Sequence, residues 1–145
     1  MPVVRNPQFY FREGFCWNNV LTTYMKCKKK EKTVQSTESM SFFSCTNVAP
    51  ERYMICLMNS RLIALYVDNF INSTSHCTTG DAKLIPIVIP SEKQLKSFVE
   101  LFDKCFACKK LEINNSYKTD EIEETLFNLE KNNDIMVADL YQIQM

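Results

Sequence analysis

Only two of the 145 residues are glycine, Gly14 and Gly80, and they lie far apart in the chain. A loop that wraps a nucleotide phosphate or a methyl-donor cofactor needs several closely spaced glycines, because its backbone must approach the ligand closely. The sequence therefore argues against a complete nucleotide-dependent enzyme. The length and the 46% share of apolar residues predict one ordinary globular domain, with an appended element at most.

The first third of the chain is predicted to be β-rich. Residues 9–11, 20–25 and 40–45 are rich in aromatic and β-branched side chains, which favour strands. Between the last two, residues 26–32 hold five lysines and one glutamate. Because these like charges repel one another, we expect a loop there.

Pro50 begins a helical region, since proline is favoured in the first turn of a helix. Two short helices are predicted over residues 50–58 and 61–71, with Ser60 as the N-cap of the second. The second helix carries apolar side chains at three-to-four spacing, namely Leu62, Leu65, Tyr66 and Phe70. Residues 72–81 lack any period and predict a polar loop. The two prolines in residues 84–90 predict an extended segment at a sheet edge or exit.

Ser91 and Gln94 form a capping box that predicts a long helix to about Leu111. Its apolar stripe consists of Leu95, Phe98, Val99, Phe102, Cys105 and Phe106. Further on, Thr119 or Asp120 caps another helix, and residues 132–133 separate it from a short last one. The expected fold is α+β: a small twisted β-rich domain with a helix pair over residues 1–90, then a helical segment, residues 91–145, that packs on that domain or on a partner.

Charge is distributed unevenly along a chain whose net charge is zero. Residues 1–49 carry a balance of +4, and residues 91–145 a balance of −4. Such asymmetry suggests a nucleic-acid-binding face and an acidic part that faces solvent or a partner. The lysines of the 26–32 segment either contact phosphates or form a solvated loop tip: Lys26, Lys28, Lys29, Lys30 and Lys32. No aromatic residue interrupts them, which argues against a stacking platform for single strands.

The cysteines and the single histidine give little support to catalysis. Cys105 and Cys108 share the spacing of a zinc knuckle, but no second pair of ligands is evident, so we favour two ordinary helix cysteines and expect no metal. His76 lies in a polar loop, where it either faces a ligand or is plain surface. The odd number of cysteines, seven, and the absence of an apolar signal stretch or membrane span predict free thiols in a reducing cytoplasm.

Four segments in order carry a resemblance to a known family: Arg12-Glu13-Gly14-Phe15-Cys16-Trp17, Leu57-Met58-Asn59-Ser60-Arg61-Leu62, the Ile-Pro segment that leads from Leu84 to Gln94, and Val137-Ala138-Asp139-Leu140-Tyr141. Together they resemble the C-terminal target recognition domain of adenine-N6 DNA methyltransferases and bifunctional restriction–modification enzymes. They are also similar to half of a type I specificity subunit. The family's glycine-rich cofactor motif and its Asn-Pro-Pro-Tyr motif are missing.

The resemblance implies a non-catalytic module that recognises duplex DNA. The methyltransferase domain or subunit, with its S-adenosylmethionine, would then be separate from this chain. Loops around residues 18–38 and 72–81 would read base edges, and the candidate readers are Asn18, Asn19, Ser75, His76, Thr78 and Thr79. The free face of the Ser91 helix would dock the catalytic partner or a second copy, through Lys93, Lys96, Glu100 and Lys104. The alternative is a protein-interaction module that does not read DNA.

Overall fold

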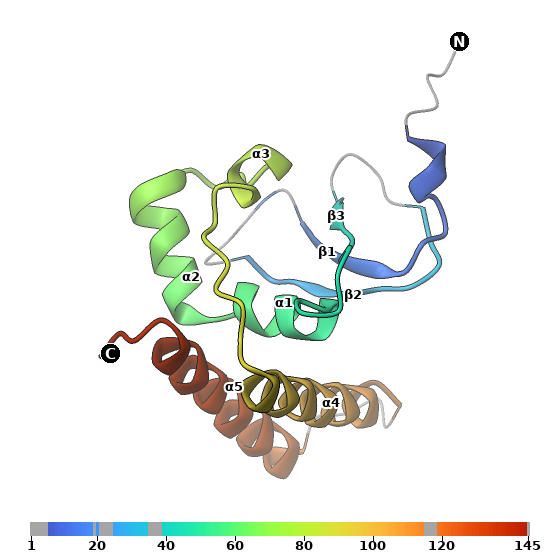
Figure 1. Ribbon diagram of the computed structural model, residues 1–145. Coiled ribbons are helices and arrows are strands. Elements are labelled where there is room, and N and C mark those ends of the chain that lie inside the picture. The colour runs from blue at the N-terminus through green and yellow to red at the C-terminus, as the bar shows by residue number, and fades with distance from the viewer. Residues whose placement is uncertain (1–5, 19, 21–24, 35–38, 115–118, 145) are drawn as a thin grey trace.

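The computed structural model describes residues 6–18, 20, 25–34, 39–114 and 119–144. It confirms an α+β fold with a small antiparallel sheet, a helix pair and a long helix near the C-terminus (Figure 1). The sheet has the order β2-β1-β3, so that β1 (Gly14–Asn18) lies between β2 (Lys28–Lys30) and β3 (Ser39–Phe42).

Two expectations for the N-terminal part are wrong. Residues 9–11 do not form a strand, because the chain at Pro7–Phe9 turns as a 3-10 helix with a proline in its first turn. The lysine segment is not simply a loop, since Lys28–Lys30 pairs with β1 and matches Lys29 to Phe15. Lysines suit an edge strand, where their charge opposes pairing with another sheet edge. Of the predicted strand at residues 20–25, positions 21–24 lie outside the described residues.

The helix pair is confirmed as α1 (Glu51–Met58) and α2 (Arg61–Tyr66), which continues into the π-helical turn η2 (Val67–Ile71). Ser60 caps α2, because its hydroxyl accepts a hydrogen bond from the Ile63 amide. The predicted apolar face is only partly correct, since of its four residues Leu62 packs against the core. Ile63 and Val67 are buried, whereas Leu65 and Phe70 are 48% and 77% exposed, so the helix is rotated relative to the stripe read from the sequence.

The segment after η2 contains more structure than the predicted polar loop. A short helix, α3 (Thr79–Ala82), begins there, and Thr78 and Asp81 form its capping box. Residues 86–90 then run on without joining the sheet. Two tyrosine side chains hold this segment in place of strand partners. The Tyr141 hydroxyl donates a hydrogen bond to the Pro86 carbonyl oxygen, and the Tyr53 hydroxyl donates one to the Val88 carbonyl oxygen.

The C-terminal part consists of α4 (Glu92–Asn114) and α5 (Asp120–Leu140). The capping box of Ser91 and Gln94 and the Thr119 cap are both present. The predicted break at residues 132–133 is wrong, and α5 is one continuous helix in place of two short ones. Asn133 is 7% exposed, because its side-chain amide donates a 2.8 Å hydrogen bond to the Cys56 carbonyl oxygen of α1.

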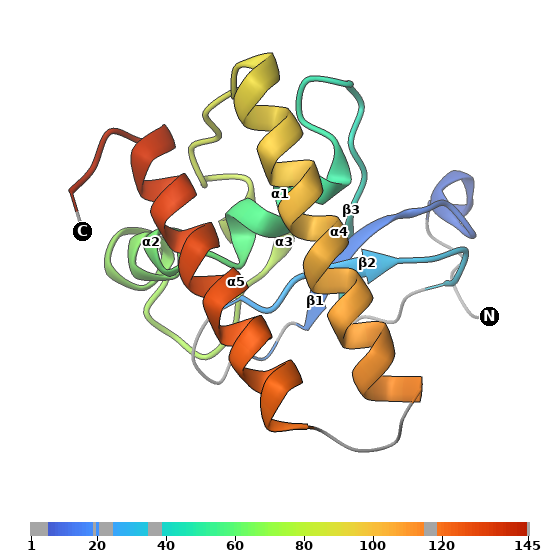
Figure 2. The same ribbon diagram turned by 90° about the horizontal axis from the view of Figure 1, so that it is seen from below.

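A single hydrophobic core joins the sheet to the C-terminal helices. Figure 2 shows α4 and α5 side by side across α1, with the sheet behind them. The buried side chains that they share include Phe15, Trp17, Tyr53, Leu57, Phe98 and Val137. The helices α4 and α5 therefore cover the buried side of α1.

Among the described residues, no single helix combines the length and apolar composition needed to cross a membrane. Within the described residues, one pair of helices meets the criteria when the two are counted together. It consists of α1 and α2–η2, which are bent by 60° relative to each other.

Candidate nucleic-acid interface

Two lysines from distant parts of the chain each lie near the same aromatic ring. The Lys29 ammonium of β2 lies 5.9 Å from the centroid of the Phe106 ring, and the Lys110 ammonium lies 4.7 Å from it. Both lysines are exposed, whereas Phe106 is partly buried against the core. We call Lys29, Phe106 and Lys110 the Phe106 site. Its lysines are close enough to one ring for cation–π attraction.

The predicted phosphate-binding lysines differ in accessibility. Lys26, Lys28 and Lys32 are exposed, as is Lys29. Lys30 is 3% exposed, and its ammonium donates hydrogen bonds to the backbone carbonyl oxygens of Arg12 and Glu31. Because these bonds hold the Lys30 charge inside the fold, we leave Lys30 out of the proposed phosphate-binding surface.

A second group of rings and cations lies at the start of β1. The rings of Phe9 and Phe43 stack with their centroids 5.3 Å apart. The Arg12 guanidinium lies 5.9 Å from the Phe9 ring and 5.2 Å from the Phe43 ring, and the Lys30 ammonium lies 5.4 Å from the Phe43 ring. This group was not predicted from the sequence, although the run of aromatic residues before Arg12 is a signal that could have indicated it.

The structure brings the described base-reading candidates together at the other end of β1. Val20 and His76 form an isolated antiparallel bridge, and the Trp17 indole donates a 3.0 Å hydrogen bond to the Cys77 carbonyl oxygen. Asn18, Ser75, His76 and Thr78 are exposed and Thr79 is partly exposed, whereas Asn19 lies outside the described residues. The hydroxyl and amide of Thr78 are bound to Asp81 in the capping box, and these hydrogen bonds lower the pKa of the Asp81 carboxyl.

These candidates and the Phe106 site do not share one face. Figure 1 shows α3, which follows His76 closely, on the opposite side of the sheet from α4. The residues near His76 and the Phe106 site therefore lie on separate surfaces of the molecule (Figure 1).

The partner-docking candidates all lie on the solvent side of α4. Lys93, Lys96, Glu100 and Lys104 are exposed, while Phe98, Leu101 and Phe102 face the core. Asp103, beside them, forms a 2.9 Å ion pair with Arg52 of α1. The burial of Phe98, Leu101 and Phe102 determines which side of α4 remains open.

Cys105 and Cys108 are partly buried in the middle of α4, where helix cysteines were expected. Burial raises the pKa of the Cys105 thiol. In the described part of the chain, no group of three or more histidine, cysteine, aspartate or glutamate side chains is placed to hold a metal ion. His76 contacts Ser75, with 3.4 Å between its Nδ1 and the Ser75 hydroxyl oxygen.

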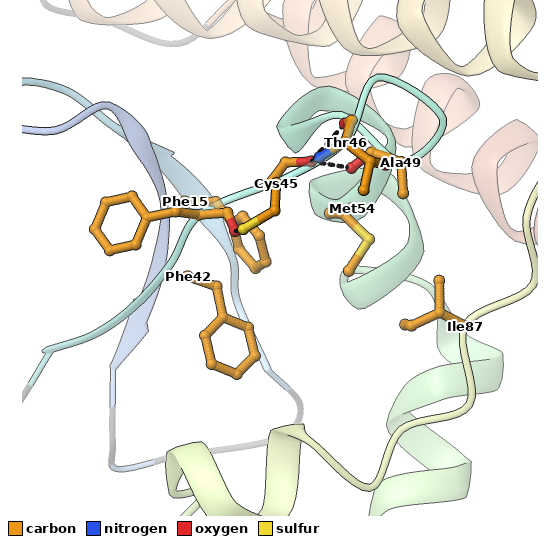
Figure 3. Close-up of a pocket in the computed structure, with 9 residues that line it drawn as sticks. Phe15, Phe42, Cys45, Thr46, Ala49, Met54 and Ile87 are labelled. Atoms are coloured by element: carbon orange, nitrogen blue, oxygen red, sulfur yellow. Dashed lines mark hydrogen bonds between the residues drawn. The ribbon is translucent and has the colours of Figure 1, made fainter. Parts of the chain in front are cut away.

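An open, mostly apolar pocket of about 280 Å³ lies between β3 and α1 (Figure 3). Phe15, Phe42, Met54 and Ile87 supply its apolar wall, and Cys45 lies at the edge formed by the chain after β3. The side chains that line it carry no charge, so the pocket holds no cation that could pair with a phosphate.

No protein-family model matches this sequence, and no curated protein sequence matches it. A function for this chain is therefore inferred from its own residues.

Proposed function

We propose that this chain is a non-catalytic DNA-binding module that contacts the phosphate backbone through the Phe106 site and the exposed lysines of the β2 segment. The observation that supports this most directly is the convergence of Lys29 and Lys110 on Phe106. The positive charges of two ammonium groups near one ring add together, and this favours an anionic group such as a phosphate at this place. Each phosphate neutralised also releases counterions from the DNA, which favours binding.

The target-recognition hypothesis extends this proposal. In it, the exposed side chains near the Val20–His76 bridge read base edges of duplex DNA, on a face separate from the phosphate contacts of the Phe106 site (Figure 1). A separate methyltransferase chain, which binds S-adenosylmethionine, would dock on the exposed face of α4 and flip the target adenine out of the helix. A second copy docked through the C-terminal helices is the other arrangement. A reducing cytoplasm suits such a module, because its seven cysteines are free thiols.

The test is a titration of labelled duplex DNA at several salt concentrations. The variant Lys29→Ala/Lys110→Ala removes both cations of the Phe106 site, and Lys83→Ala/Lys131→Ala removes two exposed lysines elsewhere. We expect the slope of log K against log salt to become shallower by about 2 in the first variant and to stay unchanged in the second, because each lost phosphate contact removes about 0.9. Equal slopes in both variants would contradict the proposal.

A protein-interaction module is the second candidate, and α5 supplies its specific support. The helix starts with Asp120, Glu121 and Glu123, and it leaves Phe127 and Ile135 65% and 53% exposed. Gel filtration with the methyltransferase chain, with and without DNA, separates the two functions. A complex that forms equally well with and without DNA, and that the variant Phe127→Ala/Ile135→Ala no longer forms, would favour this second candidate.

A further inference from the structure

The turn before β1 presents three consecutive aromatic side chains to solvent. Phe9, Tyr10 and Phe11 are 39%, 37% and 64% exposed. Backbone hydrogen bonds fold the turn back on itself, from the Tyr10 amide to Pro7 and from the Arg12 amide to Phe9. We call residues 9–12 the aromatic turn. Large apolar side chains cluster in this way at surfaces that bind something.

The backbone of the turn is held in a conformation that its central residue disfavours. Phe11 has a φ of 57°, in the left-handed region that bulky residues rarely occupy. Such conformations persist where the surrounding structure enforces them, and they gather at ligand-binding sites. Next to Phe11, the Lys30 ammonium binds the carbonyl oxygen of Arg12.

The turn lies next to cations. The Arg12 guanidinium contacts the stacked rings of Phe9 and Phe43, and Lys30 ties Arg12 to the edge strand β2. Figure 1 shows Pro7–Phe9 above the sheet and α4 below it, with Pro7–Phe9 and the C-terminal end of α4, which carries Lys110, both at the right of the view. The lysine segment contains no aromatic residue of its own. The aromatic turn and Phe106, which belong to other parts of the sequence, lie near its lysines in the folded protein.

We propose that the aromatic turn stacks on unpaired nucleobases, so that the chain binds single-stranded nucleic acid, or a single-stranded stretch beside a duplex. This inference rests on the proposed function for its phosphate contacts, which the exposed lysines of β2 and the Phe106 site provide. Exposed rings next to cations match a strand of flat bases joined by phosphates. Stacking requires no particular base, which suits a surface built from aromatic side chains and cations without a deep pocket.

The experiment compares three fluorescent probes: a blunt duplex, the same duplex with a dT tail of about 10 nucleotides, and the free dT strand, a length within the usual range of ~4–16 nucleotides for one binding fold. The unmodified protein is expected to bind the tailed duplex about tenfold more tightly than the blunt one, because stacked bases add affinity. The variant Tyr10→Ala/Phe11→Ala is expected to lose that gain and keep its affinity for the blunt duplex.

Two further variants control for folding and for simple apolar contact. Phe11→Trp keeps a ring at the site and is expected to keep the gain from the tail. Leu65→Ala/Phe70→Ala removes exposed apolar side chains on α2 and η2 and is expected to change nothing. The fluorescence of Trp17, which is fully buried, reports whether each variant is folded.

The outcomes separate this inference from the proposed function. Binding of the blunt duplex with no gain from the tail would overturn the stacking site and leave the phosphate surface intact. Binding of the free strand and not of the duplex would support the stacking site and refute duplex recognition. Failure to bind any probe would refute both, and an equal loss in the Leu65→Ala/Phe70→Ala variant would also overturn the stacking site.

Discussion

The side-chain amide of Asn133, in the middle of α5, donates a 2.8 Å hydrogen bond to the backbone carbonyl oxygen of Cys56, in the last turn of α1. Carbonyl groups in the last turn of a helix lack partners within that helix. A buried carbonyl of this kind is costly unless another group donates to it. Asn133 thus provides a polar link between two helices that otherwise meet through apolar contacts.

Replacing this amide should lower stability markedly. We expect Asn133→Ala to reduce the free energy of unfolding by about 1–3 kcal/mol, since it leaves a buried acceptor without its donor. The neighbouring Asn132 is exposed, so Asn132→Ala should change stability by less than about 0.5 kcal/mol. Urea unfolding followed by Trp17 fluorescence measures both, and equal effects would contradict the role given to Asn133.

The two glycines should respond to alanine in opposite directions. A Cβ atom on Gly14 would lie 2.4 Å from the Phe42 carbonyl oxygen and 2.7 Å from the Phe43 ring, which forces β1 and β3 apart. We expect Gly14→Ala to cost about 1–3 kcal/mol or more. Gly80 lies in α3, where the nearest atom would be 3.4 Å away, so Gly80→Ala should stabilise by about 0.4–1 kcal/mol. Thermal melts of the two variants test the contrast.

Ser60 holds the junction of α1 and α2 from both sides. Its hydroxyl donates a 2.7 Å hydrogen bond to the Leu57 carbonyl oxygen and accepts one from the Ile63 amide, and the residue is fully buried. Ser60→Ala should therefore cost about 1–2 kcal/mol, at the upper end for a lost cap. Ser97→Ala, on the exposed surface of α4, is the matched control and should be nearly neutral in the same denaturation experiment.

Stability should fall at alkaline pH. Burial raises the pKa of the Cys56 thiol from 9.0 to about 12, and it raises the pKa of Cys27 as well. Below pH 9 both states hold these protons; above it the unfolded chain loses them while the folded chain keeps them. Each such thiol then lowers the free energy of unfolding by up to about 1.4 kcal/mol per pH unit.

Urea titrations between about pH 8 and about pH 10 measure this slope. Cys56→Ala should make the decline shallower, because one buried thiol is gone. Cys45→Ser, which removes an exposed thiol, should leave the decline as it is. A decline that is the same in all three proteins would rule out the buried cysteines as its cause.

Helix starts were predictable because their signals are local. Ser60, Ser91 and Thr119 each cap a helix through a hydrogen bond to an amide three residues further on, a geometry that short sequence windows encode. The helix face of α2 and the continuity of α5 were not predictable in this way. They depend on which side chains the rest of the fold covers, and Asn133, which indicates a break by propensity, is held in place by α1.

The candidate site also has features that the sequence predicts and features that depend on tertiary packing. The lysine segment was visible in the sequence, but its strand conformation and the burial of Lys30 arise from pairing with β1. Lys110 lies four residues after Phe106 in α4, a spacing that a helix predicts, whereas the approach of Lys29 to Phe106 depends on how α4 packs across the sheet. The aromatic turn was mistaken for a strand, because its β-forming side chains outweighed the proline that turns the chain.

The common core of the sheet and the C-terminal helices limits how this protein can be cut or recombined. A proteolytic cleavage or a premature stop codon after Pro90 would remove Phe98 and Val137 and bare the apolar side of α1, including Tyr53 and Leu57. Surfaces of that kind promote aggregation. Any chimera that transplants the lysine strand and the aromatic turn into another protein therefore has to carry both long helices with them.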